Sequence, residues 1–243
     1  MKSFCDNCSL SSDIEKHRIM LNNLIDKKNC NLLDEEIVSL SQTLDNLVYK
    51  CVLCDKSLID LPKLNLKNIF GTHSTLYYYG KQHLFVNLYF YINEGIKNNE
   101  IVYISMQESL YEKLIAFLEC YGILVENIKF RQVMELILSN KEGGLIKLKE
   151  KISNVLSEDD MKKYSGIRWI GQPSYAIKTT SEKDFLDWEI NLSEAMKNTK
   201  ASLICVYDAY DCMHKGKFIN ENVIDKSLNT HSHIFSNMAL EGI

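Results

Sequence analysis

From residue 75 onwards, short apolar runs alternate with segments of helical period. Strands are expected at 75–79, 101–105, 166–170, 202–207 and 233–237. Helices are expected between them, at 83–97, 108–121, 143–156, 182–197 and 219–229. Strands separated by helices pair in parallel, because a crossover connection returns the chain to the same edge of the sheet. Residues 73–243 are therefore expected to form an α/β domain with a mainly parallel sheet.

A purely helical pattern precedes this domain. Apolar residues within 12–28 fall on one stripe of a helix, and apolar residues from Ile37 to Cys51 repeat at spacings of three and four. The interruption KKNCNLLD between them offers Asn31 or Asp34 as an N-cap. Two such helices joined by a short loop predict an antiparallel hairpin. The expected fold class is thus a two-domain α+β protein.

The expected domain boundaries follow from where the helical period is lost. Residues 1–56 form the hairpin domain, and 57–72, which contain Pro62, form a linker. The apolar stripe of a lone hairpin needs a cover. That cover is the other helix, the α/β domain or a second copy of the chain in a homodimer. An α/β domain that covers the polar face of the second helix would make an autoinhibited state.

Composition limits the kind of protein this chain can be. Of its 243 residues, 46% are hydrophobic and 25% are charged, with a net charge of −4, which fits a globular protein and not a basic nucleic-acid binder. The N-terminal residues lack an apolar signal region, and the most apolar run, residues 84–92, is too short to span a bilayer. We therefore expect a cytoplasmic protein with no membrane partner, whose eight cysteines are reduced.

Two C-x-x-C pairs flank the hairpin. Cys5 and Cys8 precede its first helix, and Cys51 and Cys54 end its second. Antiparallel helices of equal length bring the start of one beside the end of the other, so the four thiols are expected to meet as a structural Zn²⁺ site that staples the hairpin. An iron–sulfur cluster or a thiol switch is the alternative. The remaining cysteines, Cys30, Cys120, Cys205 and Cys212, are expected to be ordinary thiols.

The second helix carries Ser41, Gln42 and Asp45 on one face, within the run SQTLD. By spacing alone, such residues are usually a solvated polar face. Residues 12–52, however, resemble the stage-zero-E type of sporulation regulator, a family of small aspartyl-phosphate phosphatases with S-Q-x-L-D on the second helix of a hairpin. The resemblance implies removal of phosphate from a phosphorylated response regulator that controls sporulation. Ordinary members of that family lack the flanking cysteine pairs and the large C-terminal domain.

The chemistry implied by the resemblance fits these side chains. An aspartyl phosphate is a mixed anhydride, and the response regulator itself supplies the Mg²⁺ that holds the phosphoryl oxygens. The phosphatase needs only a polar side chain that orients water in line with phosphorus. We expect Asp45 to be the more essential residue, with Gln42 positioning the water. The alternatives are a non-catalytic protein that sequesters its regulator, and a metal or redox sensor centred on the cysteines.

The α/β region has a RecA-like order of elements but no phosphate-binding loop. G-x-x-x-x-G-K-[ST] would be needed after the first strand, where the chain has Gly80-Lys81. Thr75 replaces the first glycine and Gln82 replaces the Ser or Thr. A degenerate RecA-like domain that binds no nucleotide is therefore expected.

The same region resembles the MEDS domain, the methanogen/methylotroph sensory module. His73, Tyr79, Gly95 and the run from Tyr103 to Ser105 match its opening motifs. Tyr207-Asp208 and the segment from His231 to Asn237 match its later layout. The resemblance, over residues 73–243, implies a sensory or regulatory domain whose ligand is unknown.

A ligand pocket in a parallel sheet is expected at the carboxyl ends of the strands. Tyr79, Ser105, Met106 and Asp208 follow or end predicted strands and are the candidates there. His73 and His231 are added because of the motif alone. A tyrosine at a strand end usually packs and a lone aspartate usually caps a helix, so each candidate also has a purely structural interpretation.

Overall fold

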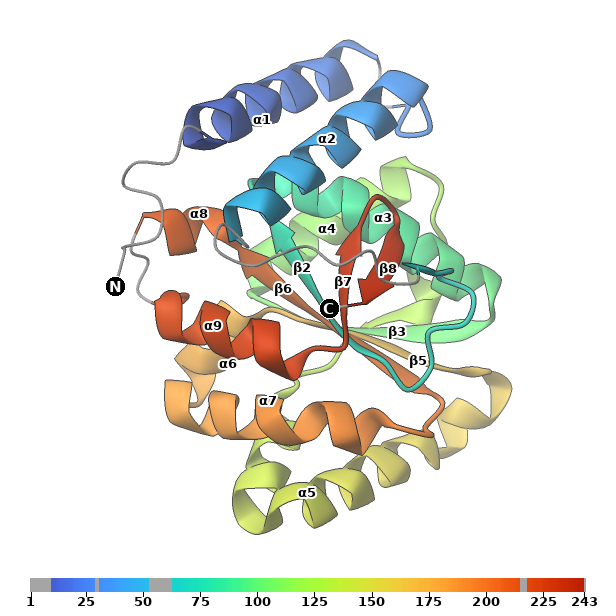
Figure 1. The fold of residues 1–243 in the computed structure, drawn as a ribbon. Coiled ribbons are helices and arrows are strands. Elements are labelled where there is room, and N and C mark those ends of the chain that lie inside the picture. The colour runs from blue at the N-terminus through green and yellow to red at the C-terminus, as the bar shows by residue number, and fades with distance from the viewer. Residues whose placement is uncertain (1–9, 29–30, 53–62, 215–217, 243) are drawn as a thin grey trace.

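The computed structural model describes residues 10–28, 31–52, 63–214 and 218–242. Within them, a central sheet has the helical hairpin on one side and a layer of further helices on the other (Figure 1). The hairpin helices are α1 (Leu10–Lys27) and α2 (Glu35–Val52). The helices of the following domain are α3 (Lys81–Lys97), α4 (Glu108–Cys120), α5 (Met134–Leu156), α6 (Pro173–Thr179), α7 (Glu182–Met196), α8 (Ala209–Met213) and α9 (Glu221–Thr230).

The described residues form an eight-stranded sheet in the order β1-β8-β7-β2-β6-β5-β3-β4. The six strands from β7 to β4 are parallel, and β8 and β1 add an antiparallel edge. The strands are β1 (Lys63–Leu64), β2 (His73–Tyr78), β3 (Glu100–Ser105), β4 (Ile128–Phe130), β5 (Gly166–Gly171), β6 (Ala201–Asp208), β7 (His233–Ser236) and β8 (Ala239–Gly242). A mainly parallel α/β sheet was expected and is confirmed; the RecA-like relationship stays a prediction.

Each strand and helix expected in the α/β region is present, but several short elements were missed. β4 has three residues and β1 two, too few for a periodic signal. Helix α5 begins nine residues before the expected position. Gly143 and Gly144 have non-helical backbone angles inside it, with a positive φ of 61° at Gly144, so two helices meet there at a kink. Only the second of these helices has a clear apolar stripe.

The hairpin forms as predicted. Its loop ends at Asp34, whose carboxylate accepts a hydrogen bond from the backbone N–H of Glu36 at 3.0 Å, so Asp34 is the N-cap of α2. Ile14 and Leu21 of α1 and Leu44 of α2 are fully buried. The cover of the hairpin is the α/β domain, since α2 packs on β2, β7 and α3. Of the expected linker 57–72, residues 57–62 lie outside the described parts.

The described end of the linker is anchored on the α/β domain. β1 pairs with β8, and Leu66 and Ile69 are buried. Arg168, in the middle of the sheet, donates hydrogen bonds to the backbone carbonyls of Leu66 and Tyr91 and forms an ion pair with Glu100. Because all these groups are buried, the described part of the linker is packed into the core of the α/β domain.

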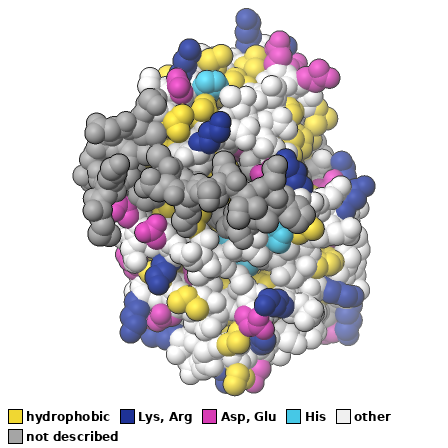
Figure 2. Space-filling model, in the orientation of Figure 1, with side chains coloured by type: hydrophobic (Ala, Val, Ile, Leu, Met, Phe, Trp, Pro, Cys, Tyr) yellow, Lys and Arg dark blue, Asp and Glu magenta, His cyan; other side chains and the backbone are white. Residues whose placement is uncertain are grey.

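The face of the molecule in Figure 2 carries positive and negative side chains interspersed, without a field of one sign. Hydrophobic side chains are exposed at the top of this view. In the hairpin, Ile19 and Met20 are each 45% exposed. Among the helices of the described residues, none has both the length and the hydropathy needed to cross a bilayer.

Candidate functional site

The polar face of α2 is turned inward, against α3 of the α/β domain. Ser41 is completely buried, Asp45 is 4% exposed, and Gln42 is partly buried. The three residues expected to do chemistry therefore lie on one face, as predicted from their spacing. Ser41 and Asp45 do not face solvent, whereas Gln42 is partly exposed.

The carboxylate of Asp45 is held by three donors from the α/β domain. Its Oδ1 accepts hydrogen bonds from Nε2 of His83 at 2.7 Å and from Nδ2 of Asn87 at 3.1 Å. Its Oδ2 accepts from the backbone N–H of Asn237 at 3.3 Å. Donors to both oxygens offset the cost of burying the carboxylate.

The hydrogen bonds around His83 fix its tautomer. The backbone N–H of Tyr79 donates to Nδ1 of His83 at 3.1 Å, so Nδ1 has no proton. Nε2 therefore carries the proton and donates it to Asp45. A chain of two hydrogen bonds therefore runs from the backbone N–H of Tyr79, after β2, through the imidazole of His83 to the carboxylate of Asp45.

The neighbours of Asp45 complete a junction between the two domains. Asn46 and Asn237 exchange hydrogen bonds between their amides, at 3.4 and 3.2 Å. The hydroxyl of Ser41 has no hydrogen-bond partner among the described residues. We name Ser41, Asp45, His83, Asn87 and Asn237 the hairpin junction.

The expected cysteine site is only partly within the described residues. Cys51 is buried in the last turn of α2. Cys5, Cys8 and Cys54 lie outside the described residues. The zinc staple stays a prediction.

Two of the expected ligand-binding residues share a cavity at the carboxyl ends of the strands. Tyr79, which follows β2, and Asp208, which ends β6, line a hollow of about 830 Å³. Helix α1 contributes Glu15 and Arg18 to its wall, and these two side chains form an ion pair at 2.6 Å. Gly80, in the same wall, has a φ of 85°, and a Cβ there would lie 2.9 Å from Cδ of Arg18.

Burial alters the acidity of the groups that line this cavity. It is the main reason why the pKa of Asp208 is raised to about 6, although the backbone N–H of Tyr210 donates to its carboxylate at 3.0 Å. Burial, and then the negative charge of Glu15, raises the pKa of Tyr79 to about 12. Tyr79 therefore stays protonated and can act as a hydrogen-bond donor.

Ser105 and Met106 do not line this cavity. The hydroxyl of Ser105 accepts a hydrogen bond from the backbone N–H of Val133 at 3.0 Å and so fixes the loop before α5. Met106 is completely buried. Their place after β3 follows the rule for parallel sheets, but their surroundings are those of packing residues.

His73 and His231 meet each other, away from that cavity. His73 begins β2 and His231 lies between α9 and β7, and their ring centroids are 3.9 Å apart. Glu189 from α7 and Cys205 from β6 join them. Each of these four residues is at most 5% exposed, and their ligating atoms lie within 4.8 Å of one another. We call these four residues the buried cluster.

The buried cluster is connected by hydrogen bonds and close approaches. Sγ of Cys205 lies 3.2 Å from Oε1 of Glu189, and Nε2 of His231 lies 3.4 Å from Oε2 of Glu189. Burial, and then the charge of Glu189, raises the pKa of the Cys205 thiol well above its usual value. Burial, and then the proximity of His73, lowers the pKa of His231 to about 3, so this imidazole is neutral.

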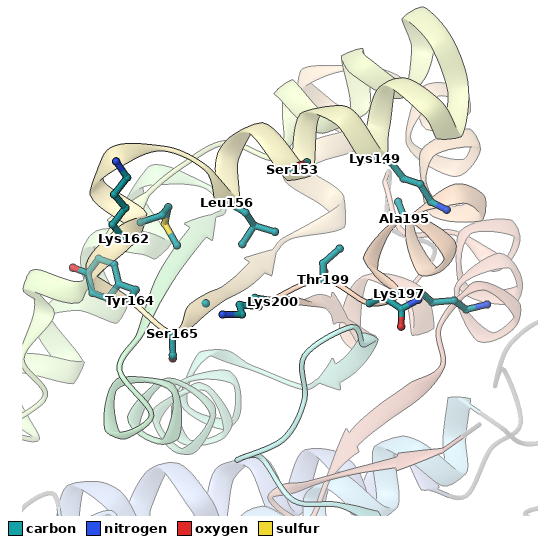
Figure 3. Close-up of a pocket in the computed structure, with 13 residues that line it drawn as sticks. Lys149, Ser153, Leu156, Lys162, Tyr164, Ser165, Ala195, Lys197, Thr199 and Lys200 are labelled. Atoms are coloured by element: carbon teal, nitrogen blue, oxygen red, sulfur yellow. The ribbon is translucent and has the colours of Figure 1, made fainter.

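A second hollow, of about 560 Å³, opens at the amino ends of β5 and β6 (Figure 3). Four lysines point around it: Lys149, Lys162, Lys197 and Lys200. Three of them form ion pairs with the carboxylates of Asp159 or Glu194. It lies at the opposite end of the sheet from the expected ligand pocket, and two carboxylates offset half of the charge of its four lysines.

Several residues of the hairpin junction and the buried cluster were not predicted from the sequence. His83 and Asn87 are four residues apart in the otherwise apolar run 83–92 of α3. Such a polar pair could have indicated a buried contact. Glu189 and Cys205 gave no comparable signal. Cys205 was expected to be an ordinary thiol, whereas it lies among three other potential metal ligands.

Two family models match the chain. Residues 72–232 match the MEthanogen/methylotroph, DcmR Sensory domain (MEDS), and residues 10–52 match the Spo0E like sporulation regulatory protein family. No curated protein matches the chain. Among solved structures, a protein of Pyrococcus horikoshii OT3 that was the subject of a structural study is similar, with 12% identity and a TM-score of 0.46, over 70% of this chain and 86% of that one. This similarity is too low to support an argument.

Proposed function

The chain belongs to the MEDS family and carries a Spo0E-like sporulation regulatory domain before its sensory domain, and on this basis we propose that it dephosphorylates the aspartyl phosphate of a sporulation response regulator. The sensory domain controls this activity. Loss of phosphate from the regulator would delay sporulation.

The proposed reaction is hydrolysis of an acyl phosphate. A water oxygen attacks phosphorus, the bond from phosphorus to the regulator's carboxyl oxygen breaks, and its electron pair remains on the carboxylate. The products are the free aspartate and inorganic phosphate, which takes up the proton of the water. Mg²⁺ bound by the regulator neutralises the phosphoryl oxygens. Gln42 orients the water, and Asp45 accepts its hydrogen bond or pairs with a lysine of the regulator.

Control of the activity rests on one observation: the α/β domain supplies all three hydrogen-bond donors described for the Asp45 carboxylate. A carboxylate engaged in this way is unable to reach a phosphoryl group on another protein. The conformation described here is therefore the inactive one. Activation requires α2 to separate from α3, which exposes Asp45 and Gln42 together.

The input to this switch is proposed to be a ligand in the cavity between α1 and the strand ends. Arg18 lies over Gly80 in its wall, so the hairpin narrows the space that Tyr79 and Asp208 offer. Tyr79 also donates its backbone N–H to His83. A ligand that displaced α1 or moved Tyr79 would weaken the hydrogen bond from His83 to the carboxylate of Asp45.

The test compares rates of phosphate loss from a Mg²⁺-bound, phosphorylated sporulation response regulator. His83→Leu/Asn87→Leu keeps the helix and its volume but removes two donors to Asp45. Leaving a buried charge without partners costs about 3–5 kcal/mol, enough to favour the open state by more than tenfold. We expect this variant to accelerate phosphate loss at least tenfold over the wild-type chain.

Two further variants make the test specific. Asp45→Ala in the open background should return the rate to that of the regulator alone. Lys97→Ala, an exposed change on the same helix, should leave the wild-type rate unchanged. An open variant that binds the regulator without accelerating phosphate loss would refute the phosphatase and favour a protein that sequesters its regulator.

A further inference from the structure

The buried cluster joins four separate elements of the α/β domain. His73 comes from β2, Cys205 from β6, Glu189 from α7, and His231 from the segment between α9 and β7 (Figure 1). Glu189 is 1% exposed, on a helix that covers the sheet. Burying an ionisable side chain of this kind is costly unless a charge or hydrogen bonds compensate it. The function of the cluster therefore depends on which group compensates the buried carboxylate of Glu189.

The imidazoles are oriented by partners outside the cluster. Nδ1 of His231 lies 2.6 Å from the backbone carbonyl of Ser227, which can only accept, so Nδ1 carries the proton. The hydroxyl of Ser193 donates to the carbonyl of Thr230 and so accepts from Nδ1 of His73, at 3.0 Å. Both histidines therefore turn Nε2, the nitrogen opposite these contacts, towards the other members of the cluster.

The potential ligand atoms consequently face one another at the centre. Nε2 of His73 and Nε2 of His231 lie 3.7 and 3.4 Å from the two carboxylate oxygens of Glu189. Nε2 of His231 has no hydrogen-bond donor among the described residues. Glu189 accepts hydrogen bonds from the thiol of Cys205 and from the hydroxyls of Tyr207, at 3.4 Å, and Thr230, at 3.2 Å. A cation bound between the four side chains would compensate the buried carboxylate and give Nε2 of His231 a partner.

The spacing of the ligand atoms matches a metal ion in size. A tetrahedral zinc ion with bonds of about 2.0–2.3 Å keeps its ligand atoms about 3.3–3.8 Å apart. The approaches here are 3.2 Å between Cys205 and Glu189, 3.4 Å between His231 and Glu189, 3.6 Å between Cys205 and His73, and 3.7 Å between His73 and Glu189. The four ligand atoms all lie within 4.8 Å of one another, so shifts of about 1 Å would surround one ion.

The chemistry of the donors selects the metal. One thiolate, two neutral imidazoles and one carboxylate suit Zn²⁺, whereas Mg²⁺ and Ca²⁺ prefer oxygen alone. The hydrogen bonds to Nδ1 of each histidine are the outer contacts that zinc-binding imidazoles usually have. We propose that the buried cluster is a tetrahedral Zn²⁺ site, with the ligands His73, Glu189, Cys205 and His231.

The role of this ion is structural. Four protein ligands leave no open position for a substrate. Binding releases the thiol proton of Cys205 to solvent, and the ion fixes α7 and the segment before β7 to the sheet. Because the site is closed, the ion is taken up on folding and exchanges slowly. This inference does not depend on the phosphatase activity or on the cysteines of the hairpin.

The experiment separates this site from the cysteine pairs of the hairpin. The full chain with Cys5→Ser, Cys8→Ser and Cys54→Ser is unfolded with a chelator and refolded with Zn²⁺ or Co²⁺. We expect about one metal ion per chain and, with Co²⁺, intense tetrahedral visible bands and a thiolate-to-cobalt charge-transfer band. In this background, Cys205→Ser removes the charge-transfer band, whereas Cys120→Ser, at an exposed thiol, keeps it.

Affinity measurements give a second readout. Ser193→Ala removes the acceptor for His73 without removing a ligand, and we expect it to weaken Zn²⁺ binding about 10–100-fold in competition with a chelator. Zinc should also raise the unfolding temperature of the triple cysteine variant. The proposal is overturned if that variant folds equally well with a chelator, retains no zinc and shows no thiolate band with Co²⁺. It is also overturned if the band survives Cys205→Ser.

Discussion

Nε2 of His83 donates a hydrogen bond of 2.7 Å to Oδ1 of Asp45, and so a sensory helix holds the carboxylate expected to act on a phosphorylated protein. The two residues are 38 positions apart and belong to different family models. Because Asp45 of the hairpin contacts His83 of the α/β domain, a change in the position of one domain affects the other. Whatever moves α3 relative to α2 also changes the exposure of Asp45.

Opening of the hairpin can be observed without any partner protein. We expect His83→Leu/Asn87→Leu to increase amide hydrogen exchange in α2 at least tenfold, because the docked state loses two donors to a buried carboxylate. Exchange in β5 and β6 should stay at the wild-type rate. Mass spectrometry of exchanged peptides measures both regions in one sample. Equal protection of α2 in the variant and in Lys97→Ala would show that these donors do not hold the hairpin.

The buried ion pair of Arg168 and Glu100 is expected to be important for stability. Arg168→Met leaves the carboxylate of Glu100 buried without its partner and frees the carbonyl of Leu66. The expected loss is about 3–5 kcal/mol in the free energy of unfolding, measured by urea denaturation. Arg168→Met/Glu100→Gln should be less destabilised than the single variant. A double variant as unstable as the sum of two single changes would contradict this coupling.

Gly95 gives a test of packing against the same arginine. A Cβ at Gly95 would lie 2.6 Å from Cδ of Arg168, which is fully buried and held by hydrogen bonds. Gly95→Ala should therefore destabilise the protein by about 1–3 kcal/mol, although alanine favours helices. Gly171→Ala is the matched control, because its Cβ would meet only Val133 at an ordinary 3.7 Å. Similar unfolding midpoints for the two variants would mean that Arg168 can move aside.

The raised pKa of Asp208 predicts a pH dependence of stability. Its folded pKa of about 6 exceeds the unfolded value, so the folded protein holds this proton more tightly. Its contribution is fully present below pH of about 4 and is lost as the pH rises through about 6, an effect on the order of 2–3 kcal/mol. The other titratable groups nearby are Glu15, Arg18, Tyr79, Tyr210, Asp211 and His214.

Asp208→Asn isolates this contribution, because an amide oxygen can still accept from the N–H of Tyr210. We expect the variant to gain stability relative to wild type as the pH is raised from 4.5 to 7, which covers most of the range between the unfolded and folded pKa values of Asp208. Urea denaturation at both pH values measures the difference. If wild type and variant change in parallel, Asp208 titrates normally.

The local spacing of apolar and polar residues determined which segments form helices and which form strands. The spacing of apolar residues from Ile37 to Cys51 was enough for a hairpin, and the alternation after residue 75 was enough for a mainly parallel sheet. The same holds for the shared face of Gln42 and Asp45, since residues three apart in a helix point the same way. Elements too short or too irregular for a period, such as β4 and the kink at Gly143, were not predictable in this way.

Which side chains meet was decided only by the tertiary structure. His73 lies beside Cys205 because β2 pairs with β6, a neighbour 132 residues away, and no local pattern encodes the order of strands. The same order divides the six expected ligand residues, with Tyr79 and Asp208 at one end of the sheet and His73 and His231 at the other. Asp45 is buried because α2 packs on α3, a contact set by the shapes and charges of two domains that the sequence describes separately.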